Sequence, residues 1–457
     1  MHSSLNNNGM FEQLEREHRQ RNLKIMKKMH IIGGGTVAHV TNHFAVSATA
    51  YGNTAMRLAQ LAVPYKFEPV LTLTSMCPRA ASGVATNADV AVWIDRVVAD
   101  PATKIVFFSC ALVDWEPESA AVAHSGKWHQ VAQLGSHETR ITGSHDPEAR
   151  VVVTLKPADK LINRIRAKRK DIILVGFKTT CGASKQDMYK AGLGLLKGAS
   201  CNLVLVNDVV TRTNMIVTPE EAAYRVTLDR DAALRELMDM ACLRANLTFT
   251  RSTVVDGTPV PWSSPEVPDS LRTVVNYCVQ KSAYKPFNGG GTVGHFAVRL
   301  SDTEFLTSIR RSDFNKIDSV GLVRVVTDGP DTVLAYGAKP SVGGQSQRIV
   351  FKDHQGFDCI VHFHCPLKGE QDLGLPRDPI PVVSQREFEC GSHECGKNTS
   401  NGLRQFGNLK CVYLHNHGPN IVFNRNIDPQ EVIDFIEANF DLSAKTDGLQ
   451  TPDTSAA

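Results

Sequence analysis

The chain has 457 residues, of which 42% are hydrophobic and 21% are charged, so it can bury enough apolar surface for about two domains. Its formal net charge of +3 argues against nucleic acid as the main partner. The 11 cysteines form no dense framework, which suits a reducing cytosol better than secretion, and no apolar run reaches membrane-spanning length. We therefore expect a cytoplasmic protein that binds neither nucleic acid nor a membrane.

The polar N-terminal segment, residues 1–28, is expected to be a tail or short helix outside the folded domains. It leads into HIIGGGTVAH, a short apolar run followed by Gly33, Gly34, Gly35 and Thr36. Glycine lets backbone amides approach a phosphate closely, and the N-terminus of a following helix adds partial positive charge. A tight turn explains the three glycines equally well, and their spacing does not match the GxGxxG fingerprint of dinucleotide-binding folds.

Helix and strand patterns alternate over the next 65 or so residues. Apolar residues at helical spacing predict helices at Tyr51–Ala62 and Ala88–Val98. Apolar runs predict strands at Val70–Thr74 and Lys104–Pro117, the second of which ends beside a lone acid, Asp114. An acid at a strand end binds a ribose or a metal ion in some folds, whereas in others it only caps the next turn.

The stretch Ile172–Val210 has the pattern of a strand, a crossover helix and a parallel strand. Two apolar runs, Ile172–Val175 and Leu203–Val206, are separated by a polar segment of helix length. Small or polar residues follow each run, and the segments after them include Phe177 and Asn207. Ligands of open α/β sheets bind beyond the carboxyl ends of the strands, so both ends are candidate sites; an ordinary βαβ unit with a turn is the alternative.

Six motifs occur in one order between residues 28 and 245: GGGT at Gly33–Thr36, a small-residue helix start near Gly52, CALVDWEP at Cys110–Pro117, LKPADKLI at Leu155–Ile162, ILVGFKTT at Ile173–Thr180 and LVNDV at Leu205–Val209. This set resembles phosphopantothenate–cysteine ligases, also called phosphopantothenoylcysteine synthetases. The resemblance implies a Rossmann-like nucleotide-binding domain at residues 29–250. It also implies a reaction of coenzyme A biosynthesis, in which ATP or CTP with magnesium activates a carboxylate that the amine of cysteine then attacks. The positions that it assigns to the nucleotide are Gly34, Gly35 and Thr36 at the phosphates and Asp114, Phe177 and Asn207 in the rest of the pocket.

Departures from the ligase pattern weaken the expectation of catalysis. The Asn-x-Ser-Ser-Gly run that precedes the Gly52 helix in the family is replaced by residues 45–49, AVSAT, with no asparagine in register. The acid of the family's GFAAET motif is Thr180 here, and the paired lysines before the LKPADKLI motif are missing, which leaves Lys127 or Lys156 as substitutes. Because a phosphate-rich transition state needs positioned cations and donors, the nucleotide fold can persist without the ligase reaction.

A predicted helix at Arg230–Ala245 closes this domain, because its apolar residues recur at helical spacing. The following segment, Thr250–Asp269, contains four prolines together with serine and glycine. This composition predicts a linker at 251–270 without regular secondary structure and a domain boundary near residue 255.

The second half of the chain centres on VHFHCP, where His362 and His364 lie two residues apart on a predicted strand. Alternate side chains of a strand share one face, so both imidazoles can reach one metal ion. A third histidine, His417, lies in VYLHNHGPN after another apolar strand. Three neutral imidazoles with an open position favour a catalytic divalent metal, zinc above all, although imidazole also suits iron, nickel or copper. Nearby residues that we interpret as core or surface groups before ligands are Cys359, Cys365, Cys390, His393 and Cys395.

Five motifs of the second half are FNGGGTVGHFAVRL at Phe287–Leu300, FLTSIRRSDFNKI at Phe305–Ile317, AKPS at Ala338–Ser341, DCIVHFHCP at Asp358–Pro366 and LHNHG at Leu414–Gly418. Over residues 275–440 they resemble the class II aldolase and adducin head family. The resemblance implies an aldolase-like domain at 271–442, and we expect residues 443–457 to form a disordered tail. It implies that the three histidines hold a divalent metal that polarises a carbonyl or enediolate. The pocket positions that it assigns to a substrate phosphate are Gly290, Ser308 and Ser341.

The aldolase pattern is incomplete as well. Aldolases of this family carry a glutamate soon after the Pro-Ser pair, where it serves as general base, and Gly343 occupies that position here. The asparagine of the first loop is His295. A dehydratase-like or isomerase-like reaction would need another acid, for which Glu389 and Glu394 are the candidates.

These patterns together predict an α/β protein with a Rossmann-like parallel-sheet domain followed by a class II aldolase-like α/β domain. The favoured function is an enzyme that binds a nucleotide and a phosphorylated small molecule, with Glu389 and Lys156 as candidate catalytic residues. The alternative is a binding or assembly protein that retains both folds and has lost catalysis. Both families form oligomers, so we expect a homo-oligomer in either case.

Overall fold

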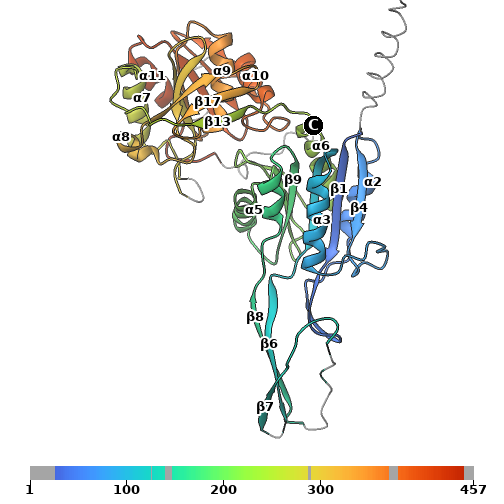
Figure 1. Ribbon diagram of the computed structural model, residues 1–457. Coiled ribbons are helices and arrows are strands. Elements are labelled where there is room, and N and C mark those ends of the chain that lie inside the picture. The colour runs from blue at the N-terminus through green and yellow to red at the C-terminus, as the bar shows by residue number, and fades with distance from the viewer. Residues whose placement is uncertain are drawn as a thin grey trace, which may run out of the picture. The chain divides into compact units, whose positions relative to one another are not determined.

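The computed structural model describes residues 26–124, 126–138, 141, 147–286, 290–369 and 379–446 (Figure 1). The chain divides into two compact units, Met1–Val175 and Gly176–Ala457, which are described in turn. Most of the two predicted tails, residues 1–25 and 447–457, lies outside the described ranges, as do residues 287–289 of the glycine-rich motif. Within those ranges, no helix combines the length and the apolar character that crossing a bilayer requires.

The first unit is built on three parallel strands in the order β4-β1-β5. Its elements are β1 (Lys28–Gly35), α2 (Asn53–Leu61), β4 (Glu68–Leu73), α3 (Asn87–Ala99), β5 (Thr103–Ala111) and α4 (Ile162–Lys168). Strand β1 is buried along nearly its whole length because it lies between two neighbours. Helix α2 packs directly on it, since a Cβ atom on Gly33 would lie 2.3 Å from the Cβ of Ala55. The predicted helices and the strand at residues 70–74 are thus confirmed.

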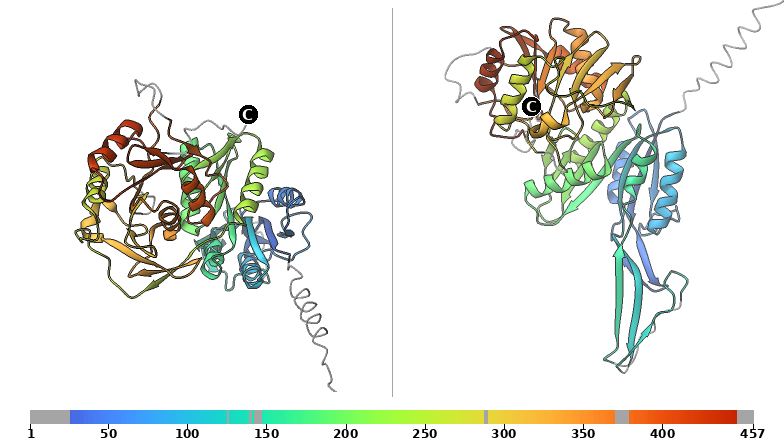
Figure 2. Two further views of the ribbon diagram at one scale, coloured as in Figure 1. Left: turned by 90° about the horizontal axis from the view of Figure 1, so that it is seen from above. Right: turned by 60° about the vertical axis from the view of Figure 1, so that its left-hand side comes forward.

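A three-stranded antiparallel arm, in the order β7-β6-β8, extends from this unit (Figure 2). Its strands are β6 (Trp115–His124), β7 (Lys127–Gln130) and β8 (Arg150–Pro157), and a separate hairpin pairs β2 (Val37–Thr41) with β3 (Phe44–Ser47). The prediction of one strand over Lys104–Pro117 is wrong, because β5 ends at Ala111 and β6 begins at Trp115. The break is hidden in the sequence because Val113 is apolar and buried; its N–H donates to Oγ1 of Thr36.

Strand β9 (Ile173–Thr180) spans the boundary between the units, and the strands after it lie in the order β12-β11-β10-β9. The following elements are α5 (Lys185–Ala199), β10 (Leu203–Asp208), β11 (Asn214–Val217), β12 (Ala223–Thr227) and α6 (Arg230–Arg244). The predicted crossover helix is confirmed as α5, which begins at the N-cap Ser184. It packs closely on β10, because a Cβ atom on Gly192 would lie 2.4 Å from Val206. The predicted helix at 230–245 is confirmed as α6.

The rest of the second unit is a ten-stranded sheet with the path β13-β17-β16-β15-β14-β18-β22-β21-β19, and β20 pairs with β21. Most neighbours are antiparallel. The strands are β13 (Arg251–Val255), β14 (His295–Arg299), β15 (Glu304–Ser308), β16 (Leu322–Thr327), β17 (Thr332–Tyr336), β18 (Cys359–His362), β19 (Val382–Val383), β20 (Arg404–Phe406), β21 (Leu409–Leu414) and β22 (Gly418–Phe423).

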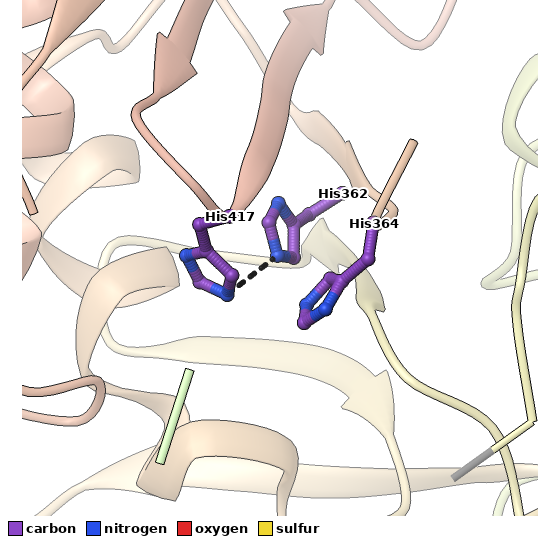
Figure 3. A group of neighbouring side chains, drawn as sticks. All are labelled: His362, His364 and His417. Atoms are coloured by element: carbon purple, nitrogen blue, oxygen red, sulfur yellow. Dashed lines mark hydrogen bonds between the residues drawn. The ribbon is translucent and has the colours of Figure 1, made fainter. Parts of the chain in front are cut away.

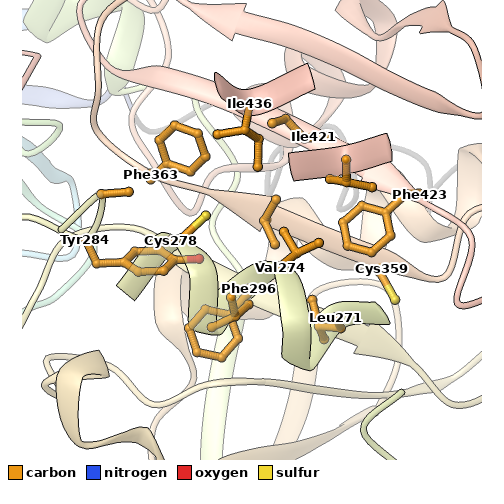
Figure 4. Close-up of a cluster of buried hydrophobic side chains, with 14 of the residues drawn as sticks. Leu271, Val274, Cys278, Tyr284, Phe296, Cys359, Phe363, Ile421, Phe423 and Ile436 are labelled. Carbon is orange, nitrogen blue, oxygen red and sulfur yellow. The ribbon is translucent and has the colours of Figure 1, made fainter. Parts of the chain in front are cut away.

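Helices pack against this sheet and close its cores. They are α7 (Asp269–Gln280), α8 (Ile317–Val320), α9 (Gln345–Asp353), α10 (His393–Gly402) and α11 (Pro429–Asn439), with 3₁₀ turns η1 (Phe314–Lys316) and η2 (Ser341–Gly344). One core joins α7 and α11 to the sheet through residues such as Leu271, Phe296 and Ile436 (Figure 4). A second core includes Val350 of α9 and Leu403 beside α10. The α/β class predicted for both parts is confirmed.

Strand β13 corrects the prediction that residues 251–270 lack regular structure. Arg251–Val255 pairs in parallel with β17, with Arg251 opposite Thr332. The sequence RSTVV is rich in β-branched residues, which favour strands, but the four prolines that follow dominate the composition of the longer window. The breaker-rich part therefore begins only after β13.

Candidate metal centre

Three histidines come together beside the carboxyl end of β18 in the ten-stranded sheet (Figure 3). His362 is the last residue of β18, His364 lies two residues further along, and His417 lies in the turn between β21 and β22. Because β18 and β22 are antiparallel neighbours, this turn lies beside the end of β18. Gly418 permits the close approach, since a Cβ atom there would lie 2.1 Å from the carbonyl oxygen of Phe363.

The three rings are close enough to share an ion. One nitrogen of each of His362, His364 and His417 lies within 4.8 Å of the others. The Nε2 atoms of His362 and His417 are 3.3 Å apart, and the three ring centroids are 4.5 to 5.1 Å apart. The structure thus brings together the three residues that the sequence selected as metal ligands.

The protonation of these rings fits a metal site. Burial lowers the pKa of His362 to about 4 and holds the pKa values of His364 and His417 well below the usual value, so the rings are neutral, which is the form that binds metal. Nδ1 of His362 carries its proton, because it lies 2.7 Å from the carbonyl oxygen of Pro419, and Nε2 is left to bind an ion. Nδ1 of His364 has no hydrogen-bond partner among the described residues. This donor set suits zinc.

A fourth imidazole, that of His295, faces the same group. Strands β14 and β18 place His295 opposite His362, with ring centroids 4.8 Å apart. Burial holds the pKa of His295 well below its usual value, and its Nδ1 has no partner in the described part of the chain. The sequence selected His295 only as a replacement for the family's asparagine. His295 is the first residue of an apolar strand pattern, and this position could have indicated that it faces the HxH motif of β18.

Cys390 lies closer to the metal centre than the sequence indicated. Its Sγ is 3.8 Å from Nε2 of His417. The side-chain amide of Gln385 lies 3.9 Å from this sulfur and 3.3 Å from the sulfur of Cys395. Cys359 and Cys365, by contrast, belong to the hydrophobic core. Cys390, which the sequence analysis interpreted as a core or surface group, therefore lies next to His417.

The histidines line a cavity of about 480 Å³ inside the second unit. Its walls come from residues 196–252 and 292–420, so the segment before β13 contributes as well as the aldolase-like segment. Ser341 and Glu389, both selected from the sequence, are among the lining residues. Charged lining residues that the sequence analysis did not select are Lys197, Glu220, Glu221, Arg310, Arg311 and Lys339. Arg310, Arg311 and Lys339 lie within the aldolase-like motifs, although no role was assigned to them there. Lys197, on α5, and Glu220 and Glu221, between β11 and β12, lie outside every motif, and only the fold brings them to the cavity.

The residues predicted to hold a substrate phosphate are brought together only in part. Ser308 and Ser341 are buried, and their hydroxyl oxygens lie 2.9 Å apart. Gly290 is exposed, with a φ of 95°, and it is not among the residues that line the cavity. Its neighbours Thr292 and Gly294 do line it.

The candidate acids differ in their surroundings. Glu389 lines the cavity, where both carboxylate oxygens accept hydrogen bonds from Nδ2 of Asn202 at 2.9 and 2.8 Å. Glu394 accepts from the backbone N–H of Thr248 and does not line the cavity. Lys156, the other catalytic candidate, lies exposed on β8 in the first unit. Only Glu389 of these three shares the cavity with the histidines.

The predicted nucleotide residues of the first unit lie at or after the ends of β1 and β5. Gly34 has a φ of 107° and approaches Thr74 so closely that a Cβ atom would lie 2.1 Å from Oγ1. Thr36 is buried, and its hydroxyl donates to Oδ1 of Asn87 at 2.8 Å, so this hydroxyl has a structural partner. Gly35 is equally enclosed, and exposed Asp114 accepts from Nζ of Lys160 at 2.5 Å.

In the second unit, Phe177 lies on β9 and Asn207 lies on β10, two neighbouring strands of its sheet. Both side chains are partly buried. Asn207 is the penultimate residue of β10, close to the predicted strand end, whereas Phe177 lies in the middle of β9, because this strand runs on to Thr180 instead of ending at Val175. Nucleotide binding itself stays a prediction.

No protein-family model and no curated protein sequence matches this chain. Among solved structures, the DNA/pantothenate metabolism flavoprotein from Streptococcus pneumoniae is similar at 16% identity over 47% of this chain and 97% of that chain, with a TM-score of 0.39. A Cab2 mutant in complex with phosphopantothenate-cysteine is similar at 14% identity over 52% of this chain and 93% of that chain, also with a TM-score of 0.39. L-fuculose 1-phosphate aldolase is similar at 18% identity over 37% of this chain and 82% of that chain, with a TM-score of 0.27.

Two of these structures are named for pantothenate metabolism or for a complex with phosphopantothenate-cysteine, and the third is named as an aldolase. A shared fold does not define an activity. The function of this protein therefore has to be argued from its own side chains.

Proposed function

We propose that the cavity of the second unit is the active site of a metal-dependent enzyme that acts on a phosphorylated carbonyl compound, with lyase or isomerase chemistry. The observation that carries this proposal is the convergence of His362, His364 and His417 on one point of the cavity wall. A divalent metal bound by these residues supplies a Lewis acid for a carbonyl oxygen. Zinc is preferred, because three imidazoles leave a position open for substrate.

Cationic side chains in the same cavity support an anionic substrate. Arg310, Arg311 and Lys339 line it, and in the described part of the chain none of the three is paired with a carboxylate. The backbone N–H of Arg310 donates to the carbonyl oxygen of Lys339 at 2.9 Å, which joins the two loops that carry these charges. Guanidinium groups and hydroxyls such as that of Ser341 are suited to a phosphate.

This function predicts metal-dependent turnover. We expect the zinc-loaded protein to cleave, isomerise or dehydrate at least one member of a panel of ketose phosphates, followed by phosphorus NMR. His364→Ala should lower kcat/KM at least about 100-fold, because two imidazoles hold the ion poorly. His415→Ala is the matched control, since His415 is a neighbouring histidine outside the cavity lining. Turnover that His364→Ala leaves unchanged would contradict the proposal.

For the ligase-like part we propose nucleotide binding, ATP or CTP with magnesium, without efficient formation of phosphopantothenoylcysteine. What supports it is the placement of a glycine and a polar residue near strand ends, Gly34 near the end of β1 and Asn207 near the end of β10. What limits catalysis is the missing asparagine at residues 45–49 and the exposed position of Lys156 on the arm. Binding without turnover needs fewer positioned charges than the reaction does.

Calorimetry should detect ATP or CTP in the presence of magnesium. We expect Asn207→Ala to weaken binding about tenfold, since one lost hydrogen bond is worth about 1–1.5 kcal/mol. Asn401→Ala, at an exposed asparagine of α10, is the control and should bind as the wild type does. The absence of heat with either nucleotide would count against this part of the proposal.

An assembly function is the second candidate, and the arm of the first unit favours it. Trp115, Trp128 and Val152 are each about half exposed on its antiparallel strands, at 52%, 54% and 51%. Exposed apolar groups on strands with unpaired edges are typical of surfaces that bind another chain. We propose a homo-oligomer that uses these strands. A stable oligomer combined with failure of both assays above would favour assembly over catalysis.

A further inference from the structure

Glu221, one of three carboxylates that line the cavity, is not part of either family pattern. It lies between β11 and β12, in the segment before the aldolase-like part, and it lines the same cavity as the three histidines. Only 1% of Glu221 is exposed. A buried carboxylate is costly unless it is paired, so its partners indicate what it can do.

The two carboxylate oxygens of Glu221 differ in the hydrogen bonds that they accept. Oε2 accepts from Nζ of Lys445. Oε1 lies 3.6 Å from Nζ of Lys197 and has no hydrogen-bond partner among the described residues. The two ammonium groups offset the cost of burying this carboxylate, and Oε1 is the one of its two oxygens that accepts no hydrogen bond.

The backbone of Glu221 is held in an unusual conformation. Its φ of 65° is in the left-handed region, which a glutamate rarely adopts. The hydroxyl of Tyr189 donates to the carbonyl oxygen of Glu221 at 2.5 Å, and the N–H of Glu221 donates to that of Thr218 at 3.0 Å. Strained residues that the surrounding structure fixes in this way occur preferentially at functional sites.

Glu221 is also tied to the metal centre by the C-terminal segment. Lys445 pairs with Glu221, and the next residue, Thr446, donates its N–H to the carbonyl oxygen of His364 at 3.0 Å. Two successive residues thus bind the acid and a candidate metal ligand.

The other acids of the cavity are already engaged. Glu220 is buried and lies 3.3 Å from Arg244, and both oxygens of Glu389 accept from Asn202. The position at which the aldolase pattern carries its acid is Gly343. Of the three carboxylates that line the cavity, Glu221 is therefore the one with an oxygen that accepts no hydrogen bond.

We propose that Glu221 is the acid–base residue of this site, an inference that rests on the metal-dependent function proposed above. In the step it performs, a C–H bond beside the substrate carbonyl breaks and its proton forms an O–H bond on Oε1. The electron pair of that bond moves onto the carbonyl oxygen as an enolate. The reverse step returns the proton to carbon, so Glu221 is regenerated. The base missing at Gly343 is thus supplied by a residue more than 100 positions earlier in the chain.

Proton exchange with solvent tests this role directly. The full-length, zinc-loaded protein is incubated in D₂O with dihydroxyacetone phosphate, glyceraldehyde 3-phosphate or ribulose 5-phosphate, and deuterium entry at carbon is followed by proton NMR. We expect the wild type to exchange at least one of these compounds. Glu221→Gln should slow the exchange at least about 100-fold, while zinc affinity and the Kd of the compound stay within about threefold. Glu437→Gln, on the exposed face of α11, should exchange at the wild-type rate.

A second variant distinguishes the loss of the acid–base group from a folding defect. Glu221→Asp keeps the charge that faces Lys197 and Lys445 but withdraws the oxygens by one methylene, so it should fold and still slow the exchange. Wild-type exchange by Glu221→Gln or by Glu221→Asp overturns this inference and leaves the metal-dependent function intact. No exchange by the wild type with any of the three compounds, while zinc is bound, overturns the proposed function and the role of Glu221 with it.

Discussion

Arg244→Met is expected to lower the free energy of unfolding by about 3–5 kcal/mol, because it leaves a buried carboxylate without its partner. The side chains of Arg244 and Glu220 are both fully buried, with Nη1 and Oε1 3.3 Å apart. Arg244 also lies 3.9 Å from Glu389 and donates to the carbonyl oxygen of Arg386 at 3.2 Å. It therefore joins α6 to the cavity wall beside Glu389. Urea unfolding followed by circular dichroism measures the loss.

The same helix offers a matched control for this prediction. Arg235 pairs with Asp231 on the solvent side of α6, and Arg235→Met should cost no more than about 1 kcal/mol. The double variant Arg244→Met with Glu220→Gln should recover part of the loss, since no buried charge of that pair then lacks a partner. A cost below about 1 kcal/mol for Arg244→Met would show that the pair does not stabilise the unit.

Elements whose signal is local were predictable from the sequence. The helix α6 has apolar residues at helical spacing, and β10 contains the short apolar run Leu203–Val206. The histidine triad was predictable for the same reason, because His362 and His364 are two residues apart and His417 follows the apolar strand β21. The predicted strand does not extend over both residues, because β18 ends at His362, so the short spacing rather than strand alternation keeps His364 beside it.

The features of the site that could not be predicted from the sequence depend on contacts between distant segments. His295 faces His362 only because of the register between β14 and β18, and no local pattern sets that register. Lys445 and Glu221 are 224 positions apart, so their pairing has no spacing to detect. The base that we propose at Glu221 therefore has no signal in the motif around Gly343.

Misplaced boundaries have a different cause. The composition of residues 250–269 conceals the strand β13, because this segment holds four prolines, although Arg251–Val255 itself contains none. The division between β5 and β6 was lost because the apolar character continues through Val113. Turns that are buried carry apolar residues, so hydrophobic patterns run through them without a break.

Acid is expected to destabilise the metal-free protein through its buried imidazoles. Burial lowers the pKa of His362 from 6.5 to about 4, and it holds the pKa values of His295, His364 and His417 well below 6.5. Between pH 6.5 and 4 the unfolded chain therefore binds protons that the folded protein excludes, so stability is complete above pH 6.5 and is lost as the pH falls. For His362 alone the loss by pH 4 is on the order of 3 kcal/mol.

Urea unfolding of the protein in a chelator, measured at several pH values from 7 to 4, tests this expectation. His362→Gln should flatten the pH dependence by up to about 1.4 kcal/mol per pH unit, because one proton fewer is taken up on unfolding. His129→Gln, at an exposed histidine of the arm, is the control and should leave the slope unchanged. Saturating zinc should shift the loss of stability to lower pH, because an ion bound to the neutral rings competes with protons and stabilises the folded state. A slope that His362→Gln does not alter would mean that His362 is already protonated in the folded protein, and a protonated His362 could not serve as a metal ligand.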